Sequence, residues 1–365
     1  MTIGQIECLE VDKTDFQHSR LVKLPERELK TGEVLLSIEA FAFTASNIAY
    51  ALHGESRKYW NFFPMPQAGW GCIPAWGFAT VEDSRNDDIE EGERFYGFFP
   101  SASGWIFKPD TVDEMGFVDA ASNRDYLPAV YNRYIRIAND AAYRADYENQ
   151  QLLFRPLFYS AYLLVDLLKG SSYFDADQVI VSSASCKTAM ALAWLLGKKN
   201  IPVIGLTSPN GRAFAKNSQN FEKVILYDDI EAELPVKRSV FIDFSGKADI
   251  FTRLFDTLGY DLCESISAGE TDWKAASSGS GLDDIRGPKP KFFVVSKYSE
   301  LRDEDLGENE LRHRMTNELI EFYPSASRWV KTARGLGGEA VQECYDRVLA
   351  GSTLPSEGFI LSFNL

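Results

Sequence analysis

The stretch that most constrains this chain runs from Gln178 to Gly211. It begins with the apolar, β-branched run Val179-Ile180-Val181, which predicts a buried strand. A turn of small residues follows at 182–186, then a helix rich in Ala, Leu and Met at 187–199 and a second apolar strand at 202–206. This order is one βαβ crossover. The first turn of such a unit directs backbone N–H groups and a helix N-terminus at an anion, most often a dinucleotide pyrophosphate.

The glycines that usually form this turn are missing. Ser183, Cys186 and Ala189 stand at the three positions of a G-x-G-x-x-G pattern, and all are small enough for a tight turn. The same segment carries hydroxyl groups on Ser182, Ser183, Ser185 and Thr188, and Lys187 adds one positive charge. The sequence leaves two interpretations open, a cofactor-binding turn and a plain crossover without a ligand.

Composition excludes several classes of function. The length of 365 residues predicts two domains, and 45% hydrophobic residues suffice for two cores. The net charge of −15 argues against binding to nucleic acid or to an anionic membrane, and no apolar run approaches the ~18 residues of a membrane span. The five cysteines form no CxxC pair, so we expect reduced thiols in a cytoplasmic protein. The net charge says little about a site for a small-molecule substrate.

The remaining sequence predicts an α/β protein with two kinds of region. Residues 1 to about 125 contain many short strand-like segments separated by turns, which is typical of a small barrel or sandwich. From residue 154 onward strands alternate with helices, which predicts a doubly wound parallel sheet. The short run 291–297 is one of these predicted strands. The last predicted strand, 358–363, does not extend such a sheet easily, so we expect it to return to the first region.

The order of these features resembles the medium-chain dehydrogenase/reductase superfamily, in its zinc-free quinone oxidoreductase and enoyl reductase branch. More narrowly, the chain resembles a family of such proteins with a serine-rich cofactor turn, a likeness that brings no substrate with it. The segments that carry the resemblance are Thr31-Gly32-Glu33-Val34-Leu35, 46–54, Pro74-Ala75-Trp76-Gly77-Phe78-Ala79, 91–97, Val179 to Ala189, Phe241-Ile242-Asp243-Phe244-Ser245-Gly246 and 350–355.

The resemblance implies a GroES-like β-barrel domain at 1–140, a Rossmann domain with a doubly wound parallel sheet at 141–300, and C-terminal helices and a strand at 301–365. Zinc-dependent members carry a Cys and a His where this chain has Asn47 and Trp76, so the resemblance implies catalysis without zinc. It also implies a homodimer, formed by pairing the edges of the nucleotide-binding sheets. The apolar run 291–296 is the candidate edge, and a monomer with that edge covered is the alternative.

The end of the second strand predicts which nicotinamide binds. NAD-binding crossovers place a carboxylate there for the ribose 2′-hydroxyl, whereas this chain has Thr207, Ser208 and, after a short turn, Arg212. Hydroxyls and an arginine suit a 2′-phosphate, so we expect NADPH. The alternative is that Arg212 is a solvated residue near the start of the next helix.

Two tyrosines are candidates to assist hydride transfer to a conjugated carbonyl, quinone or enoyl thioester, because such a reduction needs a donor near the developing oxyanion. By the resemblance, Tyr50 stands where quinone oxidoreductases carry an active-site tyrosine, and Tyr59 near that of enoyl reductases. Either phenol can instead be a packing residue, and His53 is an alternative donor. Asp243 either borders the cofactor or stabilises a turn. The remaining alternative for the whole chain is a non-catalytic NADPH-binding or scaffold protein.

Overall fold

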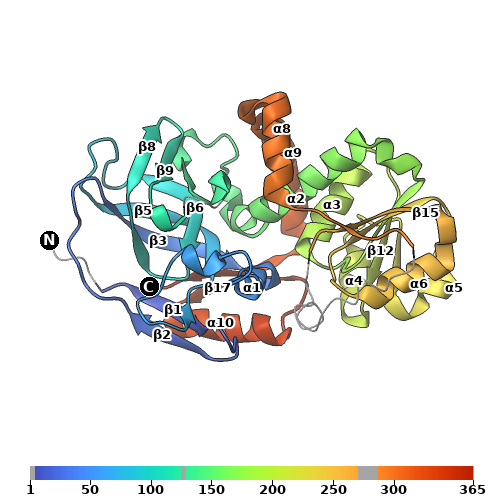
Figure 1. The fold of residues 1–365 in the computed structure, drawn as a ribbon, viewed down its shortest axis with the longest axis horizontal. Helices are drawn as coiled ribbons and strands as arrows, with labels where there is room; N and C mark the ends of the chain where they lie inside the picture. Colours follow the sequence, from blue (N-terminus) through green and yellow to red (C-terminus); the bar gives the residue numbers. More distant parts are fainter. Residues whose placement is uncertain (1–4, 125–127, 270–286, 365) are drawn as a thin grey trace. The chain divides into compact units, whose positions relative to one another are not determined.

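A computed structural model describes residues 5–124, 128–269 and 287–364, and the chain forms two units (Figure 1). Unit 1 contains the residues up to Leu153, together with the two C-terminal segments Thr332–Thr353 and Glu357–Leu365. Unit 2 contains Phe154–Lys331 and the short segment 354–356. The chain therefore returns to its N-terminal unit after completing the second one.

Unit 1 is rich in β-structure and is built on one nine-stranded sheet and one three-stranded sheet. The larger sheet has the order β17-β18-β3-β5-β6-β10-β9-β8, with β7 also paired to β3, and the smaller has the order β2-β1-β4. The strands are β1 (Glu7–Asp12), β2 (Ser19–Lys23), β3 (Val34–Phe43), β4 (Trp70–Gly71), β5 (Pro74–Ser84), β6 (Arg94–Pro100), β7 (Gly104–Phe107), β8 (Pro109–Asp113), β9 (Gly116–Asp119), β10 (Arg133–Arg136), β17 (Lys331–Leu336) and β18 (Glu357–Ser362).

The final strand lies where the sequence predicted it. β18 pairs antiparallel with β3, with Ile360 opposite Ala42. All of its residues from Gly358 to Ser362 are buried, so the strand gains its stability from the core of unit 1. Two helices, α1 (Ala45–Leu52) and α10 (Gly338–Ala350), complete this unit.

Unit 2 is a parallel sheet with helices between its strands, as predicted. Its order is β13-β12-β11-β14-β15-β16, and every pairing is parallel. This is the order of a doubly wound dinucleotide-binding sheet, in which the chain starts at the centre and winds outward in both directions. The strands are β11 (Gln178–Val181), β12 (Val203–Thr207), β13 (Lys223–Leu226), β14 (Ser239–Asp243), β15 (Leu262–Ser267) and β16 (Lys291–Phe292).

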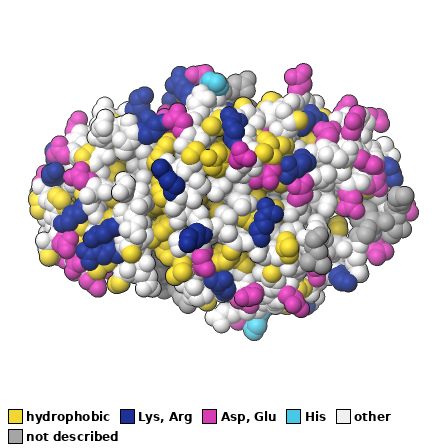
Figure 2. Space-filling view, turned by 180° about the vertical axis from the view of Figure 1, so that it is seen from behind, with side chains coloured by type: hydrophobic (Ala, Val, Ile, Leu, Met, Phe, Trp, Pro, Cys, Tyr) yellow, Lys and Arg dark blue, Asp and Glu magenta, His cyan; other side chains and the backbone are white. Residues whose placement is uncertain are grey.

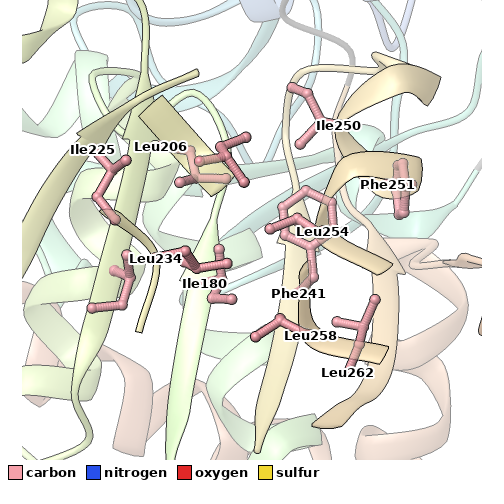
Figure 3. Packing of buried hydrophobic residues seen from close by; sticks show 12 residues of the cluster. Ile180, Leu206, Ile225, Leu234, Phe241, Ile250, Phe251, Leu254, Leu258 and Leu262 are labelled. Atoms are coloured by element: carbon pink, nitrogen blue, oxygen red, sulfur yellow. The ribbon is translucent and has the colours of Figure 1, made fainter. Parts of the chain in front are cut away.

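One face of this sheet packs against α6 (Ala248–Leu258), and Figure 3 shows the side chains that meet there. Phe241 from the sheet lies among Ile250, Phe251 and Leu254 of the helix, and all four are at most 2% exposed. Truncating a buried leucine such as Leu254 to alanine typically costs about 2–5 kcal/mol. The other helices of the unit are α3 (Lys187–Gly197), α4 (Pro209–Asn217), α5 (Ile230–Glu233), α8 (Val295–Leu306) and α9 (Glu308–Trp329), with α2 (Glu148–Gly170) entering it from unit 1.

The prediction of a strand over 291–297 is wrong in its extent. Only Lys291 and Phe292 pair with β15, and a helix, α8, begins at Val295. The apolar run is too short to decide between strand and helix by itself. The aromatic side chain of Phe293 instead packs on Tyr298 of α8, at 5.5 Å between ring centroids.

One helical stretch, Ala145–Gly170, is long and apolar enough to cross a membrane by length and composition alone, although the sequence analysis found no run of that kind. Of its most apolar window, 61% is buried inside the protein, which is also the property of a core helix in a soluble protein. On the face drawn in Figure 2, lysine and arginine side chains lie scattered among acidic ones. That face therefore presents no single extended basic patch of the kind that binds nucleic acid.

Candidate functional site: the carboxyl ends of the parallel strands

The central strands β11 and β14 lie side by side, and the chain winds away from them in opposite directions. In sheets of this type ligands bind beyond the carboxyl ends of the strands at such a switch point. Here β11 ends at Val181, immediately before Ser182, and β14 ends at Asp243. The candidate site therefore begins with the residues that follow these two strands.

Ser182 and Asp243 join the two strand ends through a buried hydrogen-bond network. The Ser182 hydroxyl donates to Asp243 Oδ1 at 2.5 Å and accepts from the backbone N–H of Phe244 at 2.7 Å. Asp243 also accepts from the hydroxyl and N–H of Ser245, at 2.6 and 2.9 Å, and from the N–H of Gly246 at 2.9 Å. Burial raises the pKa of Asp243, and the hydrogen bonds from Ser182, Ser245 and Gly246 act against that rise.

This network gives Asp243 a structural place in the site. Its two oxygens accept from a hydroxyl on the neighbouring strand end and from the loop that follows its own strand, so the carboxylate fixes both connections at the switch point. Of the two interpretations that the sequence left open, the turn-stabilising one describes the contacts of Asp243.

The serine-rich turn holds a glycine-like conformation without a glycine. Ser183 has φ +47°, in the left-handed region, and the N–H of Cys186 donates to the Ser183 carbonyl oxygen at 2.7 Å to close the turn. The N–H of Ser183 donates to the hydroxyl of Tyr227 at 2.8 Å. Burial raises the pKa of Tyr227 to about 12, so this hydroxyl is a neutral acceptor at physiological pH.

Helix α3 begins directly behind this turn. Cys186 is its N-cap residue, and the Cys186 sulfur accepts from the N–H of Ala189 at 3.4 Å. Burial raises the pKa of the Cys186 thiol to about 11, so the sulfur stays protonated. Lys187 and Thr188 form the first turn of the helix, where the helix dipole favours an anion.

The end of β12 brings three of the small residues together. Thr207 and Ser185 have hydroxyl oxygens 3.5 Å apart, and both lie against Gly211 of α4. A Cβ atom at Gly211 would lie 2.3 Å from Thr207 Oγ1 and 2.5 Å from Ser185 Oγ. Only glycine leaves room here for the helix to approach the turn this closely.

Arg212 lies on α4, which begins at Pro209 after the N-cap residue Ser208. This places Arg212 near the start of a helix, but its side chain is half-buried rather than solvated. Its Nε atom is buried, and the residues that the structure describes provide no hydrogen-bond partner for that atom. A buried guanidinium nitrogen without a partner fits an anionic ligand such as the 2′-phosphate of NADPH, because an unpaired buried donor is costly.

The two candidate tyrosines lie together in unit 1. Tyr50 is on α1, Tyr59 is on the short 3-10 helix η1 (Tyr59–Asn61), and their ring centroids are 5.4 Å apart with an edge-to-face geometry. Both side chains are half-buried. Burial raises the pKa of Tyr50 to about 12, which keeps it protonated and able to donate a hydrogen bond at neutral pH.

Asn47 and Trp76 stand at the positions where zinc-dependent members of the resembled superfamily carry metal ligands. Here both residues contact other parts of unit 1. Asn47 Nδ2 donates to the carbonyl oxygen of Pro74 at 3.0 Å, and Trp76 stacks on Tyr96 at 5.5 Å. Among residues 5–124, 128–269 and 287–364, no group of three or more His, Cys, Asp or Glu side chains is placed to hold a metal ion.

The sequence matches the family model described as "Protein of unknown function (DUF2855)" over residues 41–354. The chain belongs to this family. Its match spans the end of β3 through the end of α10, and so includes the serine-rich turn, Arg212 and both candidate tyrosines. No curated protein matches the sequence.

Several solved structures share the fold of this DUF2855 protein over nearly the whole chain. CurA from Vibrio vulnificus in complex with NADPH is 13% identical, with a TM-score of 0.62 and coverage of 98% of this chain and 99% of that chain. The YhdH oxidoreductase from Salmonella enterica in complex with NADP is 13% identical, with a TM-score of 0.56 and coverage of 98% and 99%. A mutant enoyl thioester reductase from Candida tropicalis is 12% identical, with a TM-score of 0.58 and coverage of 99% and 100%.

At these identities the likeness establishes the fold, a β-rich unit combined with a parallel-sheet unit. Two further residues lie at the candidate sites of the DUF2855 protein and were not predicted from its sequence. Tyr227 directly follows β13, and its position at the carboxyl end of a third parallel strand is the signal that could have revealed it. Tyr131 contacts Tyr50 from a segment with no readable motif.

Proposed function

We propose that this DUF2855 protein is a zinc-independent, NADPH-dependent oxidoreductase that transfers hydride to a conjugated carbonyl, a quinone or an enoyl thioester. The observation that carries the proposal is the buried Nε of Arg212, which has no partner among the described residues and lies one residue after the Gly211 contact with Thr207 and Ser185. The solved structures of similar fold that are described as complexes with NADPH or NADP support the choice of cofactor.

In this proposal two groups of residues bind different parts of the cofactor. Arg212, Ser208 and Thr207 hold the 2′-phosphate and its ribose. The turn from Ser183 to Thr188, with the first N–H groups of α3 and the charge of Lys187, holds the pyrophosphate. A part of the same proposal is that residues 141–300 form the Rossmann domain, 1–140 a GroES-like barrel and 301–365 the C-terminal helices and returning strand.

When bound, the reduced nicotinamide supplies the hydride. Tyr50, or Tyr59 beside it, donates a hydrogen bond to the substrate oxygen on which negative charge develops. The proposal also includes a homodimer, a cytoplasmic location and the absence of stoichiometric zinc. Light scattering at several concentrations tests the dimer, and elemental analysis of the purified protein tests the metal content.

The central experiment measures the binding of NADPH and of NADH to two variants, Arg212→Ala and Lys187→Ala. Arg212→Ala should weaken NADPH binding about ten- to a hundredfold, or ~1.5–3 kcal/mol, because a charge-assisted bond is lost, and should leave NADH nearly unaffected. Lys187→Ala is the matched control, because a contact to the pyrophosphate weakens both dinucleotides alike. Binding is measured by the fluorescence of the reduced nicotinamide.

Equal losses for NADPH and NADH in Arg212→Ala would refute the role of Arg212. If NADPH binds but no member of a panel of quinones, enones and enoyl thioesters is reduced, the protein is a non-catalytic NADPH-binding protein. If neither dinucleotide binds the unmodified chain, the oxidoreductase proposal fails.

A further inference from the structure

Three sulfur atoms of unit 1 lie close together, and none of them belongs to the candidate cofactor turn or to the tyrosine pair. Cys8 Sγ lies 3.7 Å from Cys72 Sγ and 3.9 Å from Met65 Sδ. Cys8 is on β1, Cys72 directly follows β4, and Met65 lies in the segment before β4. Folding therefore brings together three sulfur atoms that no short motif such as CxxC joins in the sequence.

Backbone pairing brings Met65 and Cys72 to β1. Pro64, the residue before Met65, forms an antiparallel bridge with Gly71, the residue before Cys72. Gly71 also pairs antiparallel with Val11 of β1. The segment between Pro64 and Gly71 thus closes on itself and is attached to the strand that carries Cys8. The meeting of the three sulfur atoms follows from these pairings of the main chain, so it does not depend on side-chain rotamers alone.

The cluster is buried at its thiols and more open at its thioether. Cys8 is 0% exposed and Cys72 is 1% exposed. Met65 is half-buried, and Pro64 and Pro66 on either side of it are exposed. Met65 is therefore the member of the cluster that water reaches, and an ion that binds the thiols has an entry path on that side.

A buried carboxylate near the thiols is already paired with a cation. Glu10, two residues after Cys8 on the same strand and 2% exposed, accepts from Arg20 Nε at 3.0 Å and from Arg20 Nη2 at 2.8 Å. Arg20 also donates to Gln67 Oε1 at 2.5 Å, which ties it to the segment that carries Met65. Because the guanidinium compensates the charge of Glu10, a thiolate at Cys8 does not face an uncompensated negative charge.

The chemistry of the three donors selects the metal. Soft thiolate and thioether ligands favour Cu(I), whereas zinc takes Cys, His, Asp or Glu, and four of them in structural sites. Metal–sulfur bonds of about 2.3 Å would hold two sulfur atoms about 4.6 Å apart in a linear arrangement. The 3.7 Å between the Cys8 and Cys72 sulfur atoms is shorter. An ion bound to both is therefore bent away from the line between them, which leaves a position for the Met65 sulfur.

We propose that Cys8, Cys72 and Met65 form a three-coordinate site for one Cu(I) ion in unit 1. Binding forms two copper–thiolate bonds and one copper–thioether bond, and the two thiol protons pass to water. Copper remains Cu(I) throughout, so the step consumes neither an oxidant nor a reductant. The inference is independent of the proposed oxidoreductase function, because none of its residues takes part in that function.

The first experiment titrates the full-length, reduced protein with Cu(I) in the absence of oxygen, in competition with the coloured Cu(I) chelator bathocuproine disulfonate. The expected stoichiometry is one Cu(I) per chain. Cys8→Ser and Cys72→Ser should each weaken binding more than about a hundredfold, which exceeds the roughly 10–100-fold cost of losing an outer partner of a metal ligand. Met65→Leu keeps an apolar side chain of similar size and should weaken binding about tenfold.

Cys344→Ser is the matched control, because it removes a buried thiol of α10 in the same unit. Its Cu(I) affinity and stoichiometry should equal those of the unmodified protein. Equal affinities in Cys8→Ser, Cys72→Ser and Cys344→Ser would overturn the proposal, since copper would then bind to adventitious thiols only.

The second experiment needs no substitution and so stays decisive if a buried Cys→Ser variant fails to fold. Copper K-edge X-ray absorption is measured on the unmodified protein loaded with one equivalent of Cu(I). The expected first shell is three sulfur atoms at about 2.3 Å. In Met65→Leu the number of sulfur neighbours should fall to two. A first shell of the unmodified protein that contains nitrogen or oxygen, or only two sulfur atoms, would overturn the three-coordinate site.

Discussion

Ser182→Ala tests the hydrogen-bond network that joins the ends of β11 and β14 at the switch point. Ser182 is fully buried, donates to Asp243 and accepts from the N–H groups of Phe244 and Ser245. The Ser245 N–H keeps Asp243 Oδ1 as a partner at 2.9 Å, so for the backbone the substitution chiefly removes the bond between the Phe244 N–H and Ser182. It also removes one charge-assisted bond from a buried carboxylate.

These two losses set the expected magnitude. A typical hydrogen bond between neutral groups contributes about 0.5–1.5 kcal/mol, and a hydrogen bond to a charged group contributes about 1.5–3 kcal/mol. Because neighbouring terms are not additive, we expect Ser182→Ala to destabilise unit 2 by about 2–5 kcal/mol at neutral pH. Loss of the Ser182 donor raises the pKa of Asp243 further, since that bond lowers it in the native protein.

The raised pKa gives the effect a definite pH dependence. An acid whose folded-state pKa is raised costs stability above its unfolded pKa, and this cost disappears once the group is protonated. The difference between Ser182→Ala and the native protein should therefore be smaller at about pH 4 than at about pH 7. The part caused by the lost bond to the Phe244 N–H does not depend on pH.

Amide hydrogen exchange is the suitable assay, because a chain with two units does not unfold in one cooperative step. Exchange should accelerate in peptides that cover β11 with the following turn and β14 with its loop. Ser160→Ala is the matched control, since its half-buried hydroxyl donates only to the Pro156 carbonyl within α2, at 3.3 Å. If both variants exchange at native rates in these peptides, the network does not hold the strand ends together.

Four further substitutions probe other parts of the structure. In amide hydrogen exchange, Ser183→Gly should stabilise unit 2 by up to about 1 kcal/mol, because φ +47° strains a serine, whereas Ala189→Gly, inside α3, should destabilise it by about 1 kcal/mol. Gly211→Ala should weaken dinucleotide binding in fluorescence titrations, because its methyl group displaces Thr207 and Ser185; unchanged affinity would contradict that packing. Arg94→Met breaks the pairs with Glu39 and Glu148, at 2.7 and 3.1 Å, and should cost about 1–2 kcal/mol at neutral pH. Arg94 holds the pKa of Glu39 below its usual range, so that contribution is present above about pH 4.5 and is lost in acid; a cost that persists at about pH 3 would contradict the assignment.

Local sequence patterns determined the crossover that organises unit 2. Three β-branched residues at 179–181, small residues at 182–186 and an apolar run at 187–197 each favour one kind of backbone, and the structure has β11, the turn and α3 there. The same reasoning located the returning strand β18, which pairs with β3 in unit 1. It failed at 291–297, because a short apolar run suits a strand and a helix equally well.

Only the tertiary structure decided how the site is held together. Ser182 and Asp243 are 61 residues apart in sequence, and Ser183 and Tyr227 are 44 apart, so no local pattern reveals that each pair shares a hydrogen bond. Nor does a local pattern reveal that the rings of Tyr50 and Tyr131 lie together, which they do because both pack on Phe98. Residue types and strand ends can be predicted from the sequence because they depend on neighbours along the chain. The partners of a buried polar atom depend on which distant segments fold against it.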